Sequence, residues 1–191
     1  MGPVVVWNCT RACNLACRHC YASATPGESA NELSTEEGRA FLESLAAFRV
    51  PAVLLSGGEP LMREDVFHLL EYGASLGLRM VLSTNGTLIG SATAQRLRSA
   101  GVSYAGISLD GLEAVNDAFR GTKGAFEKTL AAFRHCRAAG QKAGLRLSLT
   151  RTTVRELPAI FRLVEEEGIS RVCLYHLVSA GRGSDLQGED L

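Results

Sequence analysis

Near its start the chain reads Val4-Val-Val-Trp7-Asn-Cys-Thr-Arg-Ala-Cys13-Asn-Leu-Ala-Cys17-Arg-His-Cys20. The run Val4–Trp7 is apolar and β-branched, which is typical of a buried strand. Three cysteines follow within eight residues, in a segment that we expect to be a loop at the carboxyl end of this strand. Parallel α/β folds place their chemistry at that end.

Five further strand-like runs alternate with amphipathic segments along the chain. They are Ala52–Ser56, Arg79–Thr84, Tyr104–Leu109, Leu145–Thr150 and Arg171–Val178. We predict helices from a capping box at Ser34 and Glu37, and over about 63–77, 91–100, 125–139 and 153–168. This strict alternation predicts an α/β fold with a parallel sheet and right-handed crossovers. Six units are too few for the closed eight-unit barrel, so an open partial barrel and a doubly wound sheet both remain.

Composition bounds the class of protein. The 191 residues include 20 Lys and Arg and 20 Asp and Glu, so the formal net charge is zero and a nucleic-acid partner is disfavoured. No apolar run approaches the length of a membrane span, and the N-terminus lacks the pattern of a signal peptide. We expect a cytoplasmic protein without a membrane partner. In that compartment, clustered cysteines indicate metal binding or catalysis more often than disulfides.

The two ends of the chain bear on domain organisation. We predict one core domain over residues 1–178, followed by a truncated polar tail over residues 179–191. No sixth helix follows the last predicted strand, and a bare apolar edge strand is a liability. We therefore expect the tail to be the start of a missing C-terminal region. The start is also expected to be clipped, since the first strand begins within three residues of Met1.

The cysteine cluster admits two metal sites. Cys13, Cys17 and Cys20 could hold three corners of a [4Fe–4S] cube and leave the fourth iron open to a small molecule. The alternative is zinc with His19 or Cys9 as the fourth ligand, although structural zinc cysteines usually come as two separated pairs. The three scattered cysteines are interpreted as small buried hydrophobic residues: Cys9, Cys136 and Cys173.

The spacing CxxxCxxC after the first strand resembles the signature of the radical SAM enzymes. Three more motifs of that family follow in order, each at the carboxyl end of a predicted strand. They are Ser56-Gly57-Gly58-Glu59-Pro60, Ser83-Thr84-Asn85-Gly86 and Ser108-Leu109-Asp110-Gly111. The resemblance covers essentially the whole chain. It implies an open, partial (β/α)6 TIM-like barrel of parallel strands, here with the sixth helix missing.

The resemblance also implies a chemistry. The open iron of the [4Fe–4S] cluster would chelate the amino and carboxylate groups of S-adenosyl-L-methionine. An electron passed to the sulfonium would break a C–S bond and release a 5′-deoxyadenosyl radical, which abstracts hydrogen from a substrate. A flavodoxin or ferredoxin is the expected electron donor. No catalytic acid or base is assigned.

Several residues acquire expected roles from the resemblance. Glu59 and the backbone of Gly57–Gly58 would receive the methionine ammonium, with Pro60 fixing the turn; the alternative is a simple strand-to-helix turn. His19 would pack against adenine, or else is an exposed loop histidine. Arg120, in a stretch similar to the family's H-D-x-x-R with Asn116 replacing His, would pair with the methionine carboxylate, or else is a solvated helix residue.

Four further residues are expected at the mouth of the barrel. Ser83, Asn85 and Ser108 would bind ribose or carboxylate, although capping of the following turns is an equal alternative. Leu177 would lie near adenine, where a plain core leucine would look identical. Asp110 is interpreted as a turn cap and is not counted among the ligand contacts.

Two segments narrow the subfamily. Trp7–Asn14 and Tyr175–Gly183 resemble the radical SAM enzymes of haem d1 and alternative haem biosynthesis, which act on siroheme-derived tetrapyrroles. His176 and Arg182 would suit tetrapyrrole iron or carboxylates. Most members carry a SPASM-type C-terminal extension, which is absent here. The alternatives are a peptide-modifying or maturase-type radical SAM enzyme, and a non-catalytic iron–sulfur protein or inactive truncated remnant.

Overall fold

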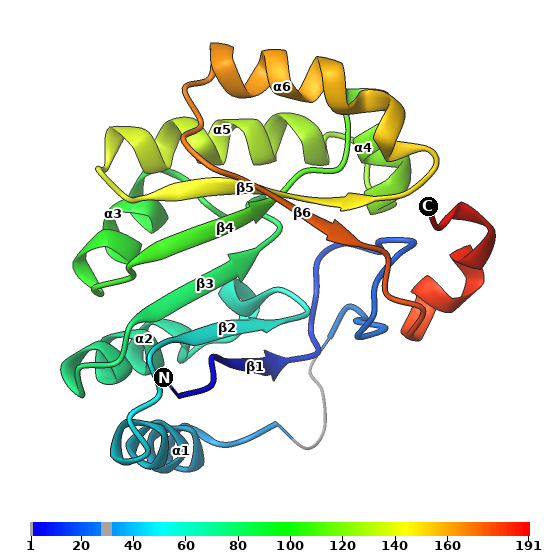
Figure 1. The fold of residues 1–191 in the computed structure, drawn as a ribbon. Coiled ribbons are helices and arrows are strands. Elements are labelled where there is room, and N and C mark those ends of the chain that lie inside the picture. Colours follow the sequence, from blue (N-terminus) through cyan, green and yellow to red (C-terminus); the bar gives the residue numbers. More distant parts are fainter. Residues whose placement is uncertain (1, 28–31) are drawn as a thin grey trace.

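The computed structural model describes residues 2–27 and 32–191, and in this part of the chain six parallel strands form one open sheet (Figure 1). The strands are β1 (Val5–Thr10), β2 (Val53–Gly57), β3 (Met80–Thr84), β4 (Tyr104–Ser108), β5 (Ala143–Leu149) and β6 (Val172–His176). Each strand pairs only with its neighbours in sequence, in the order β1-β2-β3-β4-β5-β6. A doubly wound sheet reverses its strand order, so that alternative is wrong and the open partial barrel is confirmed.

The connections between the strands are helical. They are α1 (Thr35–Ala47), η1 (Pro60–Met62), α2 (Val66–Ser75), α3 (Ser91–Ser99), α4 (Glu113–Arg120), α5 (Ala125–Ala138), η2 (Thr153–Glu156) and α6 (Leu157–Glu166). The predicted capping box of α1 is confirmed, because Ser34 Oγ accepts from the backbone of Glu37 and Glu37 accepts from the backbone of Ser34.

Two helical segments differ from the prediction. The segment α4 was not among the predicted helices; it is short, ends at Arg120 and is capped by Gly121, whose φ of 67° suits a glycine. The helix expected from residue 153 is divided into η2 and α6. Pro158 lies in the first turn of α6 and has no N–H to continue an α-helical ladder from the preceding turn, which explains the division.

The two faces of the sheet have different chemistry. Toward the helices, alternate strand residues are fully buried and apolar, including Leu55, Leu82, Ile107 and Leu145. The inner face becomes polar near the carboxyl ends of the strands, where hydroxyls line a cavity: Ser56, Ser83, Ser108 and Ser148. The sheet therefore joins an apolar core to a polar inner edge, and that edge positions the site.

The residues after β6 fold back onto the start of the chain. The segment η3 (Gly181–Glu189) lies beside the loop that follows β1 (Figure 1). The backbone N–H of Arg182 donates to the carbonyl of Cys20 at 3.0 Å, and the N–H of Arg151 donates to Glu189 at 2.7 Å. Residues expected to form a polar tail thus pack against the cysteine loop. No helix in the described residues is long and apolar enough to cross a membrane.

Candidate functional site

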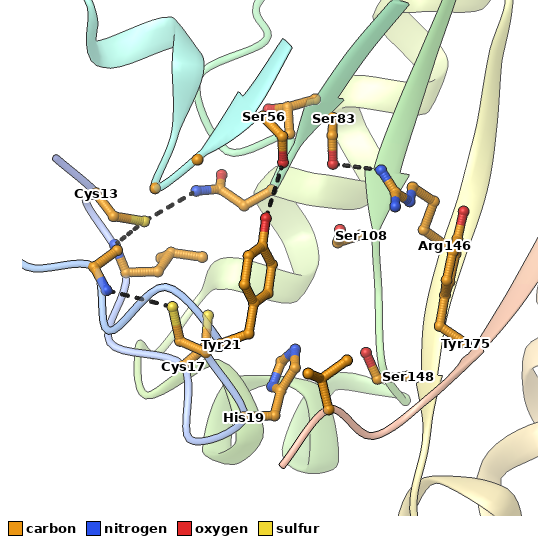
Figure 2. A pocket seen from close by; sticks show the side chains of 18 of the residues that line it. Cys13, Cys17, His19, Tyr21, Ser56, Ser83, Ser108, Arg146, Ser148 and Tyr175 are labelled. Carbon is orange, nitrogen blue, oxygen red and sulfur yellow. Dashed lines mark hydrogen bonds between the residues drawn. The ribbon is translucent and has the colours of Figure 1, made fainter. Parts of the chain in front are cut away.

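A cavity of about 250 Å³ opens at the carboxyl ends of the strands (Figure 2). Eleven of the residues expected at the site line it: Cys13, Cys17, His19, Cys20, Gly57, Gly58, Ser83, Asn85, Ser108, Arg120 and Leu177. Glu59 and Pro60 do not line the cavity and are buried behind its wall. The motifs that the sequence places at strand ends therefore meet around one space.

The cysteine loop is held by backbone hydrogen bonds on both sides. The N–H of Cys13 donates to Thr25, and the N–H of Arg18 donates to Phe119 at the end of α4. Two sulfurs also accept backbone N–H groups at 3.4 Å, Cys13 from Leu15 and Cys20 from Ala24. These contacts hold the loop in place.

The cysteines fit a [4Fe–4S] cluster better than a single ion. All three line the same cavity, and each of the six cysteines, all of which lie in the described part, is free. No three His, Cys, Asp or Glu side chains of the described residues converge as the ligands of one ion would. In a cluster each cysteine binds its own iron, so its ligands need not converge.

Neither residue suggested as the fourth zinc ligand joins the cysteines in a common ion site among the described residues. Cys9 is 2% exposed, packs in the core between sheet and helices, and does not line the cavity. Burial raises the pKa of its thiol to about 12. His19 stacks its ring on Phe119, with ring centroids 4.4 Å apart. The structure thus gives no support to the zinc alternative.

Burial also governs the thiols of Cys13 and Cys17. It raises the pKa of Cys13 to about 11 and raises that of Cys17, while the nearby Arg120 guanidinium opposes the rise at Cys17. Iron binds the thiolate, so loading these cysteines must release protons. The cationic neighbour favours the form that binds metal.

Gly57 and Gly58 allow β2 to press against β1 and the cysteine loop. A Cβ on Gly57 would lie 2.2 Å from the carbonyl oxygen of Thr10, and one on Gly58 would lie 2.2 Å from that of Ala12. The same carbonyls accept the N–H groups of Gly58 and Glu59 at 2.8 Å. An ammonium bound at this motif would therefore have to use the carbonyl oxygens of the glycines.

Glu59 joins the ends of two strands. It is fully buried, and its carboxylate accepts hydrogen bonds from the backbone of Leu61, the hydroxyl of Thr84 and the backbone of Asn85. Burial raises the pKa of Glu59 to about 7. The side chain expected on the cofactor ammonium is thus turned into the wall, where it holds the loop after β3.

Arg120 is a buried residue of α4, which overturns its interpretation as a solvated arginine. It is 7% exposed, pairs with the fully buried carboxylate of Asp110, and directs Nη1 at the sulfur of Cys17, 3.8 Å away. Asp110, interpreted from the sequence as a turn cap, also accepts the N–H of Ser148 at 2.7 Å. An acid directly after an apolar strand is the signal that could have identified it.

His19 is not an exposed loop histidine. Its side chain is 14% exposed, and Nε2 lies 3.6 Å from the carboxylate of Asp110. Burial lowers the pKa of His19 to about 4, so the ring is neutral at neutral pH. Nδ1 is buried without a hydrogen-bond partner among the described residues.

Three further residues expected at the site are Asn85, Leu177 and Ser83. The Asn85 amide links two loops, donating to Asn14 at 2.9 Å and accepting from the backbone of Thr87, which supports the capping alternative. Leu177 packs with Phe119 and Leu186 and still lines the cavity. Ser83 accepts from Arg146.

Sequence reasoning missed four residues of the cavity or gave them another role. Tyr21 donates to Asn8 at 2.9 Å and lies 3.4 Å from the hydroxyl of Ser56. Arg146 and Tyr175 form the opposite wall (Figure 2). Arg182, suggested as a tetrapyrrole contact, lines the cavity and also donates Nε to the carbonyl of Cys17 and Nη1 to that of Ala24, each at 2.8 Å. Basic residues of the last strands had no periodic signal to mark them.

Comparison with known proteins agrees with this geometry. A family model described as the radical SAM superfamily matches residues 7–164. The chain is 54% identical over 189 residues to Fe-coproporphyrin III synthase of Methanosarcina barkeri, covering 99% of this chain and 47% of that protein. It is 46% identical to pre-heme d1 synthase of Dinoroseobacter shibae, covering 98% and 46%. The chain spans about half the length of these curated relatives.

Solved structures share the fold. The native anSMEcpe structure with bound AdoMet superposes with a TM-score of 0.77 at 20% identity, covering 92% of this chain and 51% of that one. The Streptococcus suis protein SuiB bound to S-adenosylmethionine gives a TM-score of 0.79 at 20% identity, covering 92% and 40%. With the family model matched over most of its length, the chain belongs to the radical SAM superfamily.

Proposed function

We propose that this chain is the catalytic core of an enzyme that reductively cleaves S-adenosylmethionine at a [4Fe–4S] cluster and acts on a tetrapyrrole. The observation that carries the proposal is that Cys13, Cys17 and Cys20 line the same cavity as Gly57–Gly58 and Arg120. When bound, the reduced cluster supplies the electron that breaks the C5′–S bond of S-adenosylmethionine, which yields methionine and a 5′-deoxyadenosyl radical.

The chain itself positions and shelters these groups. Backbone N–H bonds to the sulfurs of Cys13 and Cys20 and the guanidinium beside Cys17 favour negative charge on the sulfurs. The close approach of Gly57 and Gly58 to Thr10 and Ala12 places both glycines on the wall of the cavity that the three cysteines also line. The apolar residues that share the cavity wall with these polar groups, such as Leu15 and Leu177, would limit the access of water to a radical formed there.

A tetrapyrrole substrate is favoured by the named relatives. Proteins called Fe-coproporphyrin III synthase, pre-heme d1 synthase and AdoMet-dependent heme synthase are 54%, 46% and 39% identical to this chain. A mycofactocin maturase of Mycobacterium tuberculosis is 36% identical, which keeps a peptide-modifying enzyme as the second candidate. A flavodoxin or ferredoxin is the proposed electron donor, and the cytoplasm, where free cysteines persist, is the proposed compartment.

The test begins with anaerobic reconstitution using iron and sulfide. Dithionite and S-adenosylmethionine are then added, and 5′-deoxyadenosine is measured. We expect product from the wild type and from Cys173→Ala, whose cysteine lies outside the cavity, and none from Cys17→Ala. A cluster without product would favour the non-catalytic iron–sulfur protein, and no cluster at all would contradict the proposal. Product formed with an iron porphyrin and not with a peptide would decide the substrate class.

A further inference from the structure

Arg146 lies on the inner face of β5, where side chains of other strands hold it in place. Its Nη1 donates to the hydroxyl of Ser83, and its guanidinium carbon lies 4.6 Å from the centre of the Tyr175 ring. Gly106 on β4 makes room for its stem, because a Cβ there would lie 2.5 Å from Cδ of Arg146. Residues of β3 and β4, together with the stacked aromatic ring on β6, thus hold the guanidinium in place.

This guanidinium has no counter-charge in the described part of the chain. No Asp or Glu oxygen of residues 2–27 and 32–191 lies within 4.0 Å of it, whereas Arg63, Arg120 and Arg134 each pair with an acid. Among the same residues, no Asp or Glu lines the cavity. A half-buried cation in such a place favours an anionic ligand.

The position of Arg146 separates it from the metal ligands. Arg146 and Tyr175 lie on the opposite side of the cavity from Cys13 and Cys17 (Figure 2). The hydroxyls of Ser108 and Ser148 line the cavity beside this arginine, on the strand next to β5 and on β5 itself. A guanidinium flanked by hydroxyls matches the geometry of a carboxylate.

The size of the cavity limits what enters it. Its volume of about 250 Å³ lies just below the ~300–1,000 Å³ of common ligand pockets. A cavity of this size is too small to enclose a whole tetrapyrrole together with S-adenosylmethionine, so such a substrate would insert only a side chain. Haem-type tetrapyrroles carry carboxylate side chains on their rims, which have the required size and charge.

We propose that Arg146 binds the carboxylate of a substrate side chain inserted into the barrel, and thereby selects an acidic side chain for hydrogen abstraction. This inference rests on the proposed function, because it assigns the substrate contact of the same cavity. The contact is a charge-assisted hydrogen bond and leaves the carboxylate chemically unchanged.

The test compares equilibrium binding of iron coproporphyrin III with that of its tetra-amide, which is isosteric and neutral. The reconstituted wild type, Arg146→Gln, Arg146→Lys and Arg171→Gln are titrated by absorption. Arg171 is the matched control, since it also stacks on a tyrosine, Tyr104, but does not line this cavity. Affinity for S-adenosylmethionine and 5′-deoxyadenosine formation are measured on the same samples.

We expect the wild type and Arg171→Gln to prefer the acid by at least about tenfold, since truncating one partner of a charge pair has effects of this size or larger. The preference should fall to about twofold or less in Arg146→Gln and be partly kept in Arg146→Lys. An unchanged preference in Arg146→Gln, or a wild type that binds both porphyrins equally, would overturn the inference.

Two further outcomes separate this inference from the proposed function. If Arg146→Gln weakens S-adenosylmethionine binding and leaves the porphyrin preference intact, the arginine serves the cofactor and the inference is wrong. If no variant forms 5′-deoxyadenosine but the acid preference depends on Arg146, the proposed function fails and the carboxylate site stands.

Discussion

Arg120 and Asp110 form an ion pair that is closed to solvent on both sides, with Asp110 fully buried and Arg120 7% exposed. The same guanidinium reaches the sulfur of Cys17, and the same carboxylate holds the N–H of Ser148. One pair of charges therefore connects the cysteine loop to β5 through the loop after β4.

Replacing Asp110 with Asn should destabilise the protein strongly. A buried guanidinium would lose its counter-charge, and breaking a buried pair in this way typically costs about 3–5 kcal/mol. Urea unfolding of the metal-free protein measures the loss. The double variant Asp110→Asn with Arg120→Gln should recover part of it, because no unpaired charge remains. A single variant as stable as the wild type would show that the pair is solvated in solution.

Arg182 is expected to control how firmly the cluster is retained. Arg182→Gln removes two charge-assisted hydrogen bonds to the carbonyls of Cys17 and Ala24, each contributing about 1.5–3 kcal/mol. Iron release to a chelator should become at least about tenfold faster, as a loss of 1.4 kcal/mol implies. Arg137→Gln is the control, since Arg137 also donates to a carbonyl, that of Glu167, far from the cysteine loop. Equal release rates in both variants would contradict the role of Arg182.

The two glycines at the end of β2, Gly57 and Gly58, give a steric test. Gly58→Ala should prevent β2 from closing on the cysteine loop, because the added Cβ would lie 2.2 Å from the carbonyl oxygen of Ala12. Gly58 has no positive φ, so the effect comes from contact rather than backbone strain. Gly90→Ala, where a Cβ meets nothing within 4 Å, should fold and bind iron like the wild type. The measurements are thermal unfolding and iron content after reconstitution. Normal iron binding by Gly58→Ala would overturn the steric explanation.

The fold could be predicted because its signals are local. Apolar runs and helical spacing mark each strand and most helices, and the order of units predicts a parallel sheet. The helix α4 escaped this reasoning, because it has only eight residues and its buried face includes the polar Asn116 and Arg120 beside Phe119. Its burial depends on Asp110, a partner supplied by another segment of the chain.

Only those parts of the site that belong to sequence motifs could be predicted. The cysteine spacing and the glycines at strand ends identified the cavity. These residues can be recognised from sequence because a cysteine is a metal ligand by its residue type and a glycine acts through its backbone alone. Glu59 was misplaced, since its partners Thr84 and Asn85 lie on the next strand and loop. Arg146 was given no role, and the contacts of Arg182 with the cysteine loop were not predicted, because each side chain is held by residues far away in sequence. Tertiary hydrogen bonds leave no periodic trace in the chain.

Glu59 gives the fold a pH dependence whose sign is set by burial. Burial raises the pKa of Glu59 in the folded protein from 4.5 to about 7, despite three hydrogen bonds to its carboxylate. Between these values the folded state binds more protons than the unfolded chain, so stability is lost as the pH rises through this window. A pKa shift of this size corresponds to a loss of about 3 kcal/mol at most in the free energy of unfolding.

We expect the difference in the free energy of unfolding between the wild type and Glu59→Gln to change with pH. Urea unfolding of the metal-free proteins at pH 5 and pH 8 should show the wild type losing about 2 kcal/mol relative to the variant as the pH rises. The fixed penalty of placing an amide against the N–H groups of Leu61 and Asn85 is the same at both pH values and cancels. A difference that does not change with pH would mean that these donors keep Glu59 ionised in the folded protein. The carboxylate would then stabilise the joint between β2 and β3 at every pH above its unfolded pKa.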